Sequence, residues 1–294
     1  MQDGLPVGTG PQGSQDKAQV SKDIPLLVIE AGRTERHYWR DLWAYRELFL
    51  FLAWRDILVR YKQTAIGIAW SVIRPVLTMA VFTAVFGRIA KLPSEGTPYP
   101  VLVFAAMLPW YFFATAVTEG SNSLIQNANI VSKVYFPRLI VPISAVAVSL
   151  VDFLISLLLL AALMVWYPVV PSPRVIVLPA FLALLLVVTV GLTLWLAALN
   201  VRYRDFRYVV PFVMQVGLFL SPVGFSSAVV PEPWRLVYSL NPMVGIIEGF
   251  RWCLLDNYRL DTTALALGTA ISFVILGLGV AHFRRVERSL ADVI

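Results

Sequence analysis

Six long runs of apolar residues constrain the fold of this chain more than any other feature of its sequence. A helix needs roughly 20 apolar residues to cross about 30 Å of hydrocarbon. Runs of about that length, bounded by charged residues or by Pro and Gly, extend over 66–89, 99–117, 139–166, 175–199, 209–229 and 262–283. The sequence therefore predicts an all-α membrane protein with six transmembrane helices.

The composition supports the same class of protein. Of the 294 residues, 58% are hydrophobic and 14% are charged, and the mean hydropathy is +0.73. A soluble domain carries about 25% charged residues, so its surface would be poorly hydrated with this composition. The net charge of +6 would favour nucleic acid in a soluble chain, but in a membrane protein basic residues mark the cytoplasmic loops. No nucleic-acid partner is expected.

Two segments precede the first apolar run. Residues 1–21 are polar and contain no apolar core of a signal peptide. Residues 1–33 are predicted to form a disordered cytoplasmic tail. In residues 34–64, Leu42, Tyr45, Phe49 and Leu52 recur every three or four positions, with arginines between them. This pattern is typical of an amphipathic helix in the membrane interface, and a cytosolic helix packed on a partner is the alternative. Residues 65–294 then form the transmembrane domain.

The distribution of Lys and Arg predicts the orientation in the membrane. With a cytoplasmic N-terminus, the inside segments hold 17 of the 24 basic residues, the outside segments hold six, and Arg74 lies within the first run. Basic residues are enriched in cytoplasmic loops. Both termini are therefore expected on the cytoplasmic side of the membrane, and the charged loop 200–208, NVRYRDFRY, should face the same side.

The segment 230–261 differs from the other loops. It is too apolar for a solvated loop and too interrupted by Pro and Gly for a membrane span. Non-helical backbone at membrane depth is tolerated when protein buries it or when it lines a cavity. We expect one or two short helices that form a re-entrant hairpin on the outside.

The motifs of common catalytic sites are missing from the sequence. It contains no P-loop, no HExxH and no Cys/His cluster, so neither nucleotide nor metal is expected to bind to this chain. Acidic residues within the apolar runs are few, the main one being Asp152, which we place near one end of the third run. An ion-coupled carrier is disfavoured because it would be expected to bury ionisable groups at mid-membrane.

Two features of the apolar runs have alternative explanations. Arg74 either anchors the first span at the headgroups, with Pro75 in the first helical turn, or faces an anionic substrate. The stretch LPWYFFA contains the successive aromatic residues Trp110, Tyr111, Phe112 and Phe113. These rings either lie at a membrane interface, as aromatic residues often do, or line a track for sugars.

Several motifs together resemble a known family. They are RYKQTAIGIAWSVIRPVLTM, YPVLVFAAMLPWYFF, NANIVSKVYFPRLIVP, NVRYRDFRYVVPF and LNPMVGIIEGFRW, in this order from about residue 36 to the C-terminus. The pattern resembles the transmembrane permease of type-2 ABC exporters, and in particular the permeases that export O antigen, related polysaccharides and teichoic acid. Residues 1–33 have no counterpart in the resemblance.

The resemblance implies a homodimer that encloses a channel for a polysaccharide linked to polyprenyl pyrophosphate. Two copies of a separate cytoplasmic ATPase would bind ATP and Mg²⁺, so that this chain is not itself an enzyme. Two cytoplasmic elements would contact the ATPase, the first resembling the family's coupling helix. Their candidate residues are Asn129, Lys133, Tyr135, Phe136 and Arg138 in the first element, and Arg202, Arg204, Asp205 and Arg207 in the second.

The resemblance also suggests three places where substrate would pass. The expected residues are Arg55, Arg60 and Lys62 for phosphate at the entrance, Arg74, Trp110, Tyr111, Phe112 and Phe113 for the channel, and Trp234, Asn241, Pro242 and Glu248 for the periplasmic gate. Phosphate recognition would use the forked donors of arginine.

Three alternatives to polysaccharide export stay open at this point. The chain could belong to an exporter of a small lipid or drug, or it could only hold a polymer-synthesising enzyme at the membrane. A membrane-embedded glycan transferase would need acidic residues for metal binding and general-base catalysis. The few candidates for that role, Asp152, Asp205 and Glu248, form no paired motif in the sequence.

Overall fold

The computed structural model describes residues 38–62, 67–94 and 96–287. The chain divides into two units, 1–41 and 42–294, and helix α2 (Tyr38–Ala44) spans the boundary between them. All the helices after α2 belong to the second unit. The predicted tail 1–33 lies outside the described residues, as do the ends of the predicted interface helix, 34–37 and 63–64.

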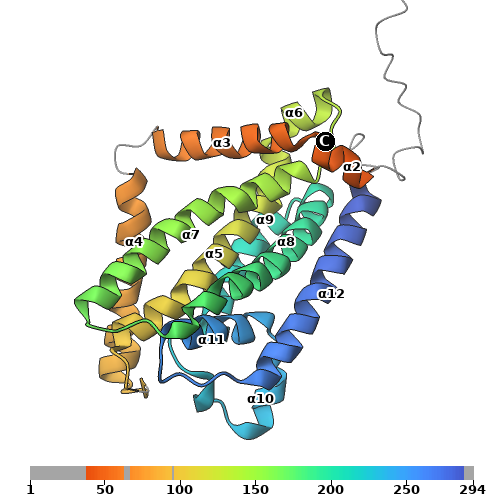
Figure 1. Ribbon diagram of the computed structural model, residues 1–294. Helices are drawn as coiled ribbons and strands as arrows, with labels where there is room; N and C mark the ends of the chain where they lie inside the picture. The colour runs from red at the N-terminus through yellow and green to blue at the C-terminus, as the bar shows by residue number, and fades with distance from the viewer. Residues whose placement is uncertain (1–37, 63–66, 95, 288–294) are drawn as a thin grey trace, which may run out of the picture. The chain divides into compact units, whose positions relative to one another are not determined.

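The described residues are nearly all helical and contain no strand. The helices are α3 (Arg46–Lys62), α4 (Gly67–Phe82), which continues as the π-helix η2 (Thr83–Ile89), α5 (Tyr99–Gln126), α6 (Ala128–Lys133), α7 (Ile140–Trp166), the 3₁₀ turn η3 (Pro173–Val177), α8 (Leu178–Arg202), α9 (Phe206–Leu220), the 3₁₀ turn η4 (Ser227–Val229), α10 (Glu232–Ser239), α11 (Pro242–Leu254) and α12 (Thr262–Glu287). Figure 1 shows their arrangement.

Within the described residues, five helical segments are long and apolar enough to cross a membrane, namely Val72–Ile89, Tyr99–Gln126, Ile140–Trp166, Pro173–Arg202 and Thr262–Glu287. Helix α9 is apolar but has only 15 residues. The prediction of an all-α membrane protein is therefore confirmed, and the number of six spans stays a prediction.

Two of the predicted boundaries near α9 are wrong. The fifth run was expected to continue to residue 229, but α9 ends at Leu220 and Ser221 is extended. Pro222 explains this end, because a proline disfavours helical geometry in the residue before it. The charged loop 200–208 is also shorter than expected, since α8 continues to Arg202 and α9 begins at Phe206.

Helix α5 forms the centre of the second unit. Every side chain from 101 to 110 is buried, and α5 packs against α7, α8, α9 and α11. A helix that is apolar on all sides is typical of a position surrounded by other helices. The second predicted span therefore lies inside the protein rather than against lipid.

Helices α8 and α12 pack closely along their length (Figure 1). A Cβ atom added to Gly279 would overlap the carbonyl oxygen of Gly191, and one added to Gly191 would lie 2.6 Å from Cα of Leu276. Small residues allow membrane helices to approach in this way without side chains between them. A larger residue at Gly191 or Gly279 would force the two backbones apart.

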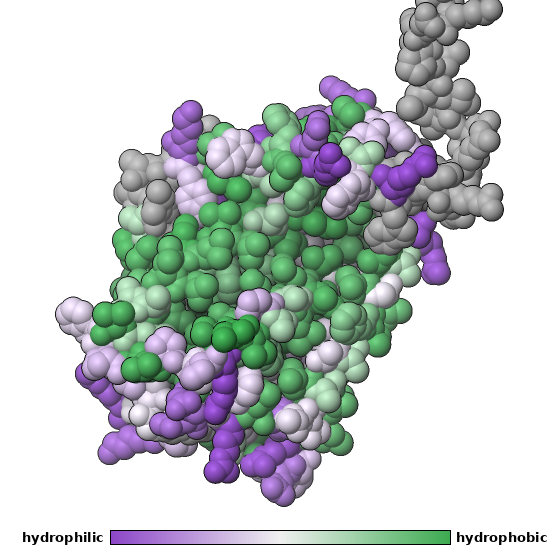
Figure 2. Space-filling model, viewed as in Figure 1, coloured by the Kyte–Doolittle hydropathy of each residue, from purple (hydrophilic) through white to green (hydrophobic). Residues whose placement is uncertain are grey.

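On the face shown in Figure 2, a hydrophobic band lies between two polar ends. Large apolar side chains such as Leu158, Phe212, Phe219 and Leu278 are exposed, as expected for a surface in contact with lipid. We name the two ends by their short helices. The α6 end also carries α3, and the α10 end carries α11 (Figure 1).

Helix α3 presents apolar residues on more than one side. The predicted apolar face turns inward, with Leu52 buried, Phe49 half-buried and α7 packed against the helix. Phe51 and Trp54 are exposed at 63% and 62%. The sequence pattern thus identified the face that packs on α7. That α3 lies in the membrane interface stays a prediction, and the exposed aromatic residues are suited to such a position.

Candidate functional site

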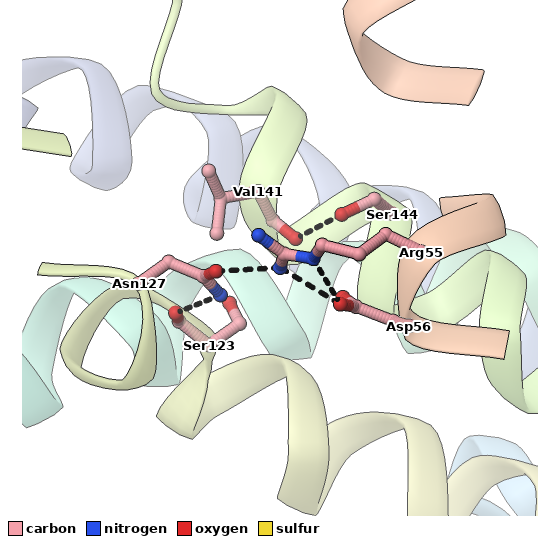
Figure 3. A network of polar contacts seen from close by, with 6 residues as sticks. All are labelled: Arg55, Asp56, Ser123, Asn127, Val141 and Ser144. Carbon is pink, nitrogen blue, oxygen red and sulfur yellow. Dashed lines mark hydrogen bonds and ion pairs between the residues drawn. The ribbon is translucent and has the colours of Figure 1, made fainter. Parts of the chain in front are cut away.

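A polar network joins α3 to the end of α5 (Figure 3). Arg55 donates to Oδ1 of Asn127 at 2.7 Å and to Oδ1 of Asp56 at 2.8 Å, with an ion pair of 2.7 Å to the same carboxylate. Asn127 in turn donates to the carbonyl of Ser123 at 2.9 Å. Because Asn127 directly precedes α6, this network fixes α3 against the point where the candidate coupling helix begins.

The second predicted phosphate ligand, Arg60, also has a protein partner. Its Nη1 lies 2.7 Å from Oδ2 of Asp152 in α7, and Tyr61 donates to the other carboxylate oxygen. Asp152 is well inside α7 rather than near its end, which corrects the sequence-based placement. Lys62 is exposed. Of the three basic residues predicted at the entrance, Arg55 and Arg60 therefore bind carboxylates of the chain itself.

Helix α6 and the segment after it contribute exposed and buried residues. Asn129, Lys133 and Tyr135 are exposed, whereas Phe136 is only 4% exposed. Arg138 is half-buried; its backbone N–H donates to Oε1 of Glu287 at 2.8 Å, and its guanidinium donates to the carbonyl of Glu287 at 2.9 Å. A partner protein can thus reach the first three residues, while the last two hold the segment to the bundle and to the end of α12.

The junction of α8 and α9 lies at the same end. Buried Asn200 donates to the carbonyl of Ser121 at 3.0 Å and to Oδ1 of Asn122 at 2.8 Å, which ties α8 to the last turns of α5. Four charged side chains beyond Asn200 are exposed, and none forms an ion pair with the part of the chain that the structure describes. They are Arg202, Arg204, Asp205 and Arg207.

We call these exposed residues of α6 and of the α8–α9 junction the coupling platform. The platform consists of Asn129, Lys133, Tyr135, Arg202, Arg204, Asp205 and Arg207. It carries four cationic side chains, one carboxylate and the exposed aromatic ring of Tyr135, and the exposed ring of Tyr203 lies next to Arg202 and Arg204 in the chain. Exposed aromatic and arginine side chains are enriched at protein interfaces.

The predicted aromatic channel residues form a packed core within one subunit. Trp110, Phe112 and Phe113 are at most 6% exposed. Phe112 contacts Phe153 edge-on at 5.6 Å between ring centroids, and Trp110 packs so closely on Gly217 of α9 that a Cβ there would lie 2.8 Å from the ring. Tyr111 is half-buried and faces Thr78 and Arg74 of α4. Tyr111 is thus the one with access to a surface.

Arg74 lies near the start of the candidate span Val72–Ile89 and is exposed. This place suits a headgroup anchor, because an arginine near a helix end can reach the interface. Pro75, in contrast, is inside α4 rather than in its first turn. Because α4 begins at Gly67, one residue after the predicted start of the first run at 66, the alternative that places Pro75 in the first helical turn is wrong.

The four predicted gate residues occupy different environments at the α10 end. Trp234 of α10 is 63% exposed. Asn241 caps α11, since its side chain accepts from the backbone of Met243 at 3.0 Å and donates to Ser221 at 3.0 Å, and Pro242 is the first residue of the helix. Glu248 is 1% exposed within α11. Two short helices are present where one or two were expected, and their role as a gate stays a prediction.

Arg251 is the residue at this end that the sequence analysis missed. The distribution of charge places it among the basic residues of an outside loop, but it is fully buried and donates to the carbonyls of Leu102, Val223 and Phe225 at 3.2, 2.9 and 2.8 Å. Its guanidinium also lies over the ring of Tyr258. The signal was its position in the apolar helix α11, one turn after Glu248. Arg251 joins α11 to α5 and to the segment after α9.

The described residues contain no cluster of three or more His, Cys, Asp or Glu side chains that could hold a metal ion. At the α10 end, helix α11 carries a buried glutamate and a buried arginine, Glu248 and Arg251. The arrangement at the α6 end is an exposed basic and aromatic platform. Together with the apolar band, they define a multispanning membrane protein with an exposed basic and aromatic surface at one end.

Comparison with protein families assigns this membrane protein to a class. Residues 47–255 match the model of the ABC-2 type transporter family, which is more than half of the chain. The chain therefore belongs to the ABC-2 type transporter family. The resemblance inferred from the sequence motifs is confirmed.

The relatives of the chain are similar over nearly their whole length. The O-antigen export system permease protein RfbA of Myxococcus xanthus is 30% identical over 87% of this chain and 98% of its own length. A protein of the same name from Klebsiella pneumoniae is 24% identical over 84% and 95%. The polysialic acid transport protein KpsM of Escherichia coli is 21% identical over 82% and 93%.

Proposed function

We propose that this chain is the membrane subunit of an ATP-driven exporter that moves a lipid-linked polysaccharide across the bacterial inner membrane. The observation that carries the proposal is the similarity to permeases named for O-antigen export and to a polysialic acid transport protein, which extends over more than four fifths of the chain. An exporter of a small lipid or drug would share the family but not this group of relatives.

In this proposal the chain is not an enzyme by itself. Two copies form the channel, and two copies of a separate ATPase, which bind ATP and Mg²⁺, dock on the coupling platform. Hydrolysis then favours one arrangement of the helices over another, because a ligand shifts an equilibrium only by its differential affinity for the two states. Both termini and the platform face the cytoplasm, which agrees with the distribution of basic residues.

A continuous set of contacts leads from the platform toward the α10 end. Arg138, after α6, is bonded to Glu287 at the end of α12. Helix α12 packs along α8 and reaches α11, where a Cβ on Gly245 would lie 2.8 Å from the carbonyl of Ala264. Because closely packed helices transmit rigid-body shifts, a push on α6 would reach α11 through α12.

The first test is biochemical. The chain is purified from its native membrane with its ATPase, and ATP hydrolysis is measured with and without the lipid-linked polysaccharide. We expect a stable complex whose hydrolysis rises with the glycolipid. Loss of the complex in the triple variant Arg202→Gln, Arg204→Gln and Arg207→Gln, with unchanged folding, would support the platform.

The control for the platform is the variant Arg88→Gln, which removes an exposed positive charge outside the platform. It should leave both the complex and its hydrolysis unchanged. Absence of any copurifying ATPase would contradict the proposed function. If an unrelated small lipid stimulates ATP hydrolysis and the glycolipid does not, the result would favour the alternative, an exporter of a small lipid.

A further inference from the structure

A cavity of about 410 Å³ opens at the α10 end. Its walls come from the segment around η4, from Arg235 of α10, from Glu248 of α11 and from residues 257–261 before α12. The volume lies within the roughly 300–1,000 Å³ range of small-molecule sites. The cavity is separate from the coupling platform and from the aromatic core around Trp110.

Glu248 gives this cavity an unusual wall. Glu248 is 1% exposed as a residue, and its carboxyl interacts with Ser227. Its atom Oε1 is buried and has no hydrogen-bond partner among the residues that the structure describes. A buried polar atom without a partner is costly. A buried acceptor at the wall of a cavity is therefore suited to a donor supplied by a ligand.

The other polar groups of the wall differ in kind. Arg259 is exposed and offers only donors, and no ion pair or hydrogen bond of its side chain occurs within the described ranges. Arg235 offers donors as well, although it is held by Glu232 at 3.4 Å and by the carbonyl of Val230 at 3.1 Å. Asp261 is an acceptor, and Asn257 can both donate and accept.

This mixture selects the chemistry of the ligand. A simple anion would be repelled by Glu248 when ionised and by Asp261, and a simple cation would be repelled by Arg235 and Arg259. The hydroxyl groups of one polyol molecule can donate to the carboxyl oxygens and also accept from the guanidinium groups. A set of convergent donors and acceptors in a cavity of this size fits a sugar unit with several free hydroxyl groups.

We propose that the cavity between α10, α11 and residues 257–261 binds a saccharide unit of the exported polymer. Glu248 and Asp261 accept hydrogen bonds from its hydroxyl groups, and Arg259 and Asn257 donate to them. The cavity thereby holds the polymer as it leaves the α10 end. This inference rests on the proposed function, because it identifies the polysaccharide as the source of the sugar.

The experiment uses the complex of the permease with its ATPase in lipid nanodiscs. The probe is the polysaccharide released by mild acid from the envelope of cells that carry this gene, so that it lacks its lipid. Binding is followed by saturation-transfer NMR titration. We expect binding to the wild type, and a dissociation constant raised about tenfold in Arg259→Gln, which loses a charged donor, and in Glu248→Gln, which replaces one of two acceptor oxygens with an amide donor.

The matched control is Arg88→Gln, which removes a positive charge outside the cavity and should leave the dissociation constant unchanged. Arg259 is exposed, so its variant tests the cavity without changing a buried residue. Equal binding in all variants, or no binding to the wild type, would overturn the proposal. Binding of inorganic phosphate that competes with the polysaccharide would also overturn it, in favour of an anion site.

The same preparation separates this inference from the proposed function. If lipid-linked polysaccharide stimulates ATP hydrolysis but the released polysaccharide does not bind at the cavity, only the inference fails. If the glycolipid neither stimulates hydrolysis nor binds, the proposed function fails as well.

Discussion

Arg60 of α3 and Asp152 of α7 form an ion pair of 2.7 Å, with about a third or less of each side chain exposed. The pair ties the helix before the first span to a point well inside the third predicted span. An isolated carboxylate at this depth would be costly, so the pair explains how α7 tolerates Asp152. It also gives Arg60 a structural role in addition to its predicted role in phosphate binding.

This pair can be tested with a double-mutant cycle. We expect Arg60→Gln and Asp152→Asn to lower the free energy of unfolding by similar amounts, with a coupling of about 0.5–1 kcal/mol between them. Thermal unfolding in detergent measures the cycle. If Arg60 instead serves the substrate, Arg60→Gln would abolish glycolipid-stimulated ATP hydrolysis while Asp152→Asn would preserve it.

Phe136 and Tyr135 should behave differently despite being neighbours. Phe136 is buried, so Phe136→Ala is expected to destabilise the protein by about 3–5 kcal/mol. Tyr135 is 53% exposed, so Tyr135→Ala should change stability by no more than about 0.5 kcal/mol and still weaken copurification of the ATPase. Unfolding curves and a pull-down assay on both variants check this. A stable Phe136→Ala variant that fails to bind the ATPase would show that Phe136 contacts the partner.

Arg251 should be essential for the stability of the packing between α11, α5 and the segment after α9. Arg251→Met removes three donors to backbone carbonyls and leaves those acceptors buried, which we expect to cost on the order of 3 kcal/mol of stability. Arg259→Gln is the matched control, because Arg259 is exposed in the same region. Thermal unfolding of both variants is the measurement. Equal stabilities of Arg251→Met and Arg259→Gln would contradict the role of Arg251 in holding α11 to α5 and to the segment after α9.

Glu248 predicts a dependence of stability on pH. Burial raises the pKa of the Glu248 carboxyl above its ordinary value of 4.5, so the folded protein binds this proton more tightly than the unfolded chain. Stability is then lost as the pH rises from about the ordinary value through the folded-state pKa. Glu248→Gln removes this loss, and its melting temperature should exceed that of the wild type at neutral pH but not near pH 4.

The measurement for Glu248 is a series of unfolding curves between pH 4 and pH 8. The control is Glu232→Gln, because Glu232 is exposed at 88% of its side chain and belongs to α10 at the same end. Its difference from the wild type should not follow the same trend. A parallel pH dependence of Glu248→Gln and the wild type would contradict a raised pKa.

The sequence by itself determined the class, the helical architecture and most of the spans. An apolar run of about 20 residues crosses a membrane as a helix, because a helix satisfies its backbone hydrogen-bonding groups within the segment. The motifs that resemble the family also follow in order along the chain. It also identified the exposed charges at 202–207, because charged residues between apolar runs remain in water. The end of the fifth run, by contrast, was predicted wrongly, because the pattern of apolar residues alone does not take the local effect of Pro222 into account.

Only the tertiary structure decided which charged and aromatic residues are buried or bonded within the chain and which are exposed. Arg55 and Arg60 resemble phosphate ligands in the sequence, yet their partners Asn127 and Asp152 lie 72 and 92 residues away along the chain. Arg251 resembles a solvated residue until three carbonyls from other segments converge on it. Local patterns record the period and polarity of one helix, whereas the partner of a charge is set by the packing of several helices, and that packing depends on contacts distant in sequence.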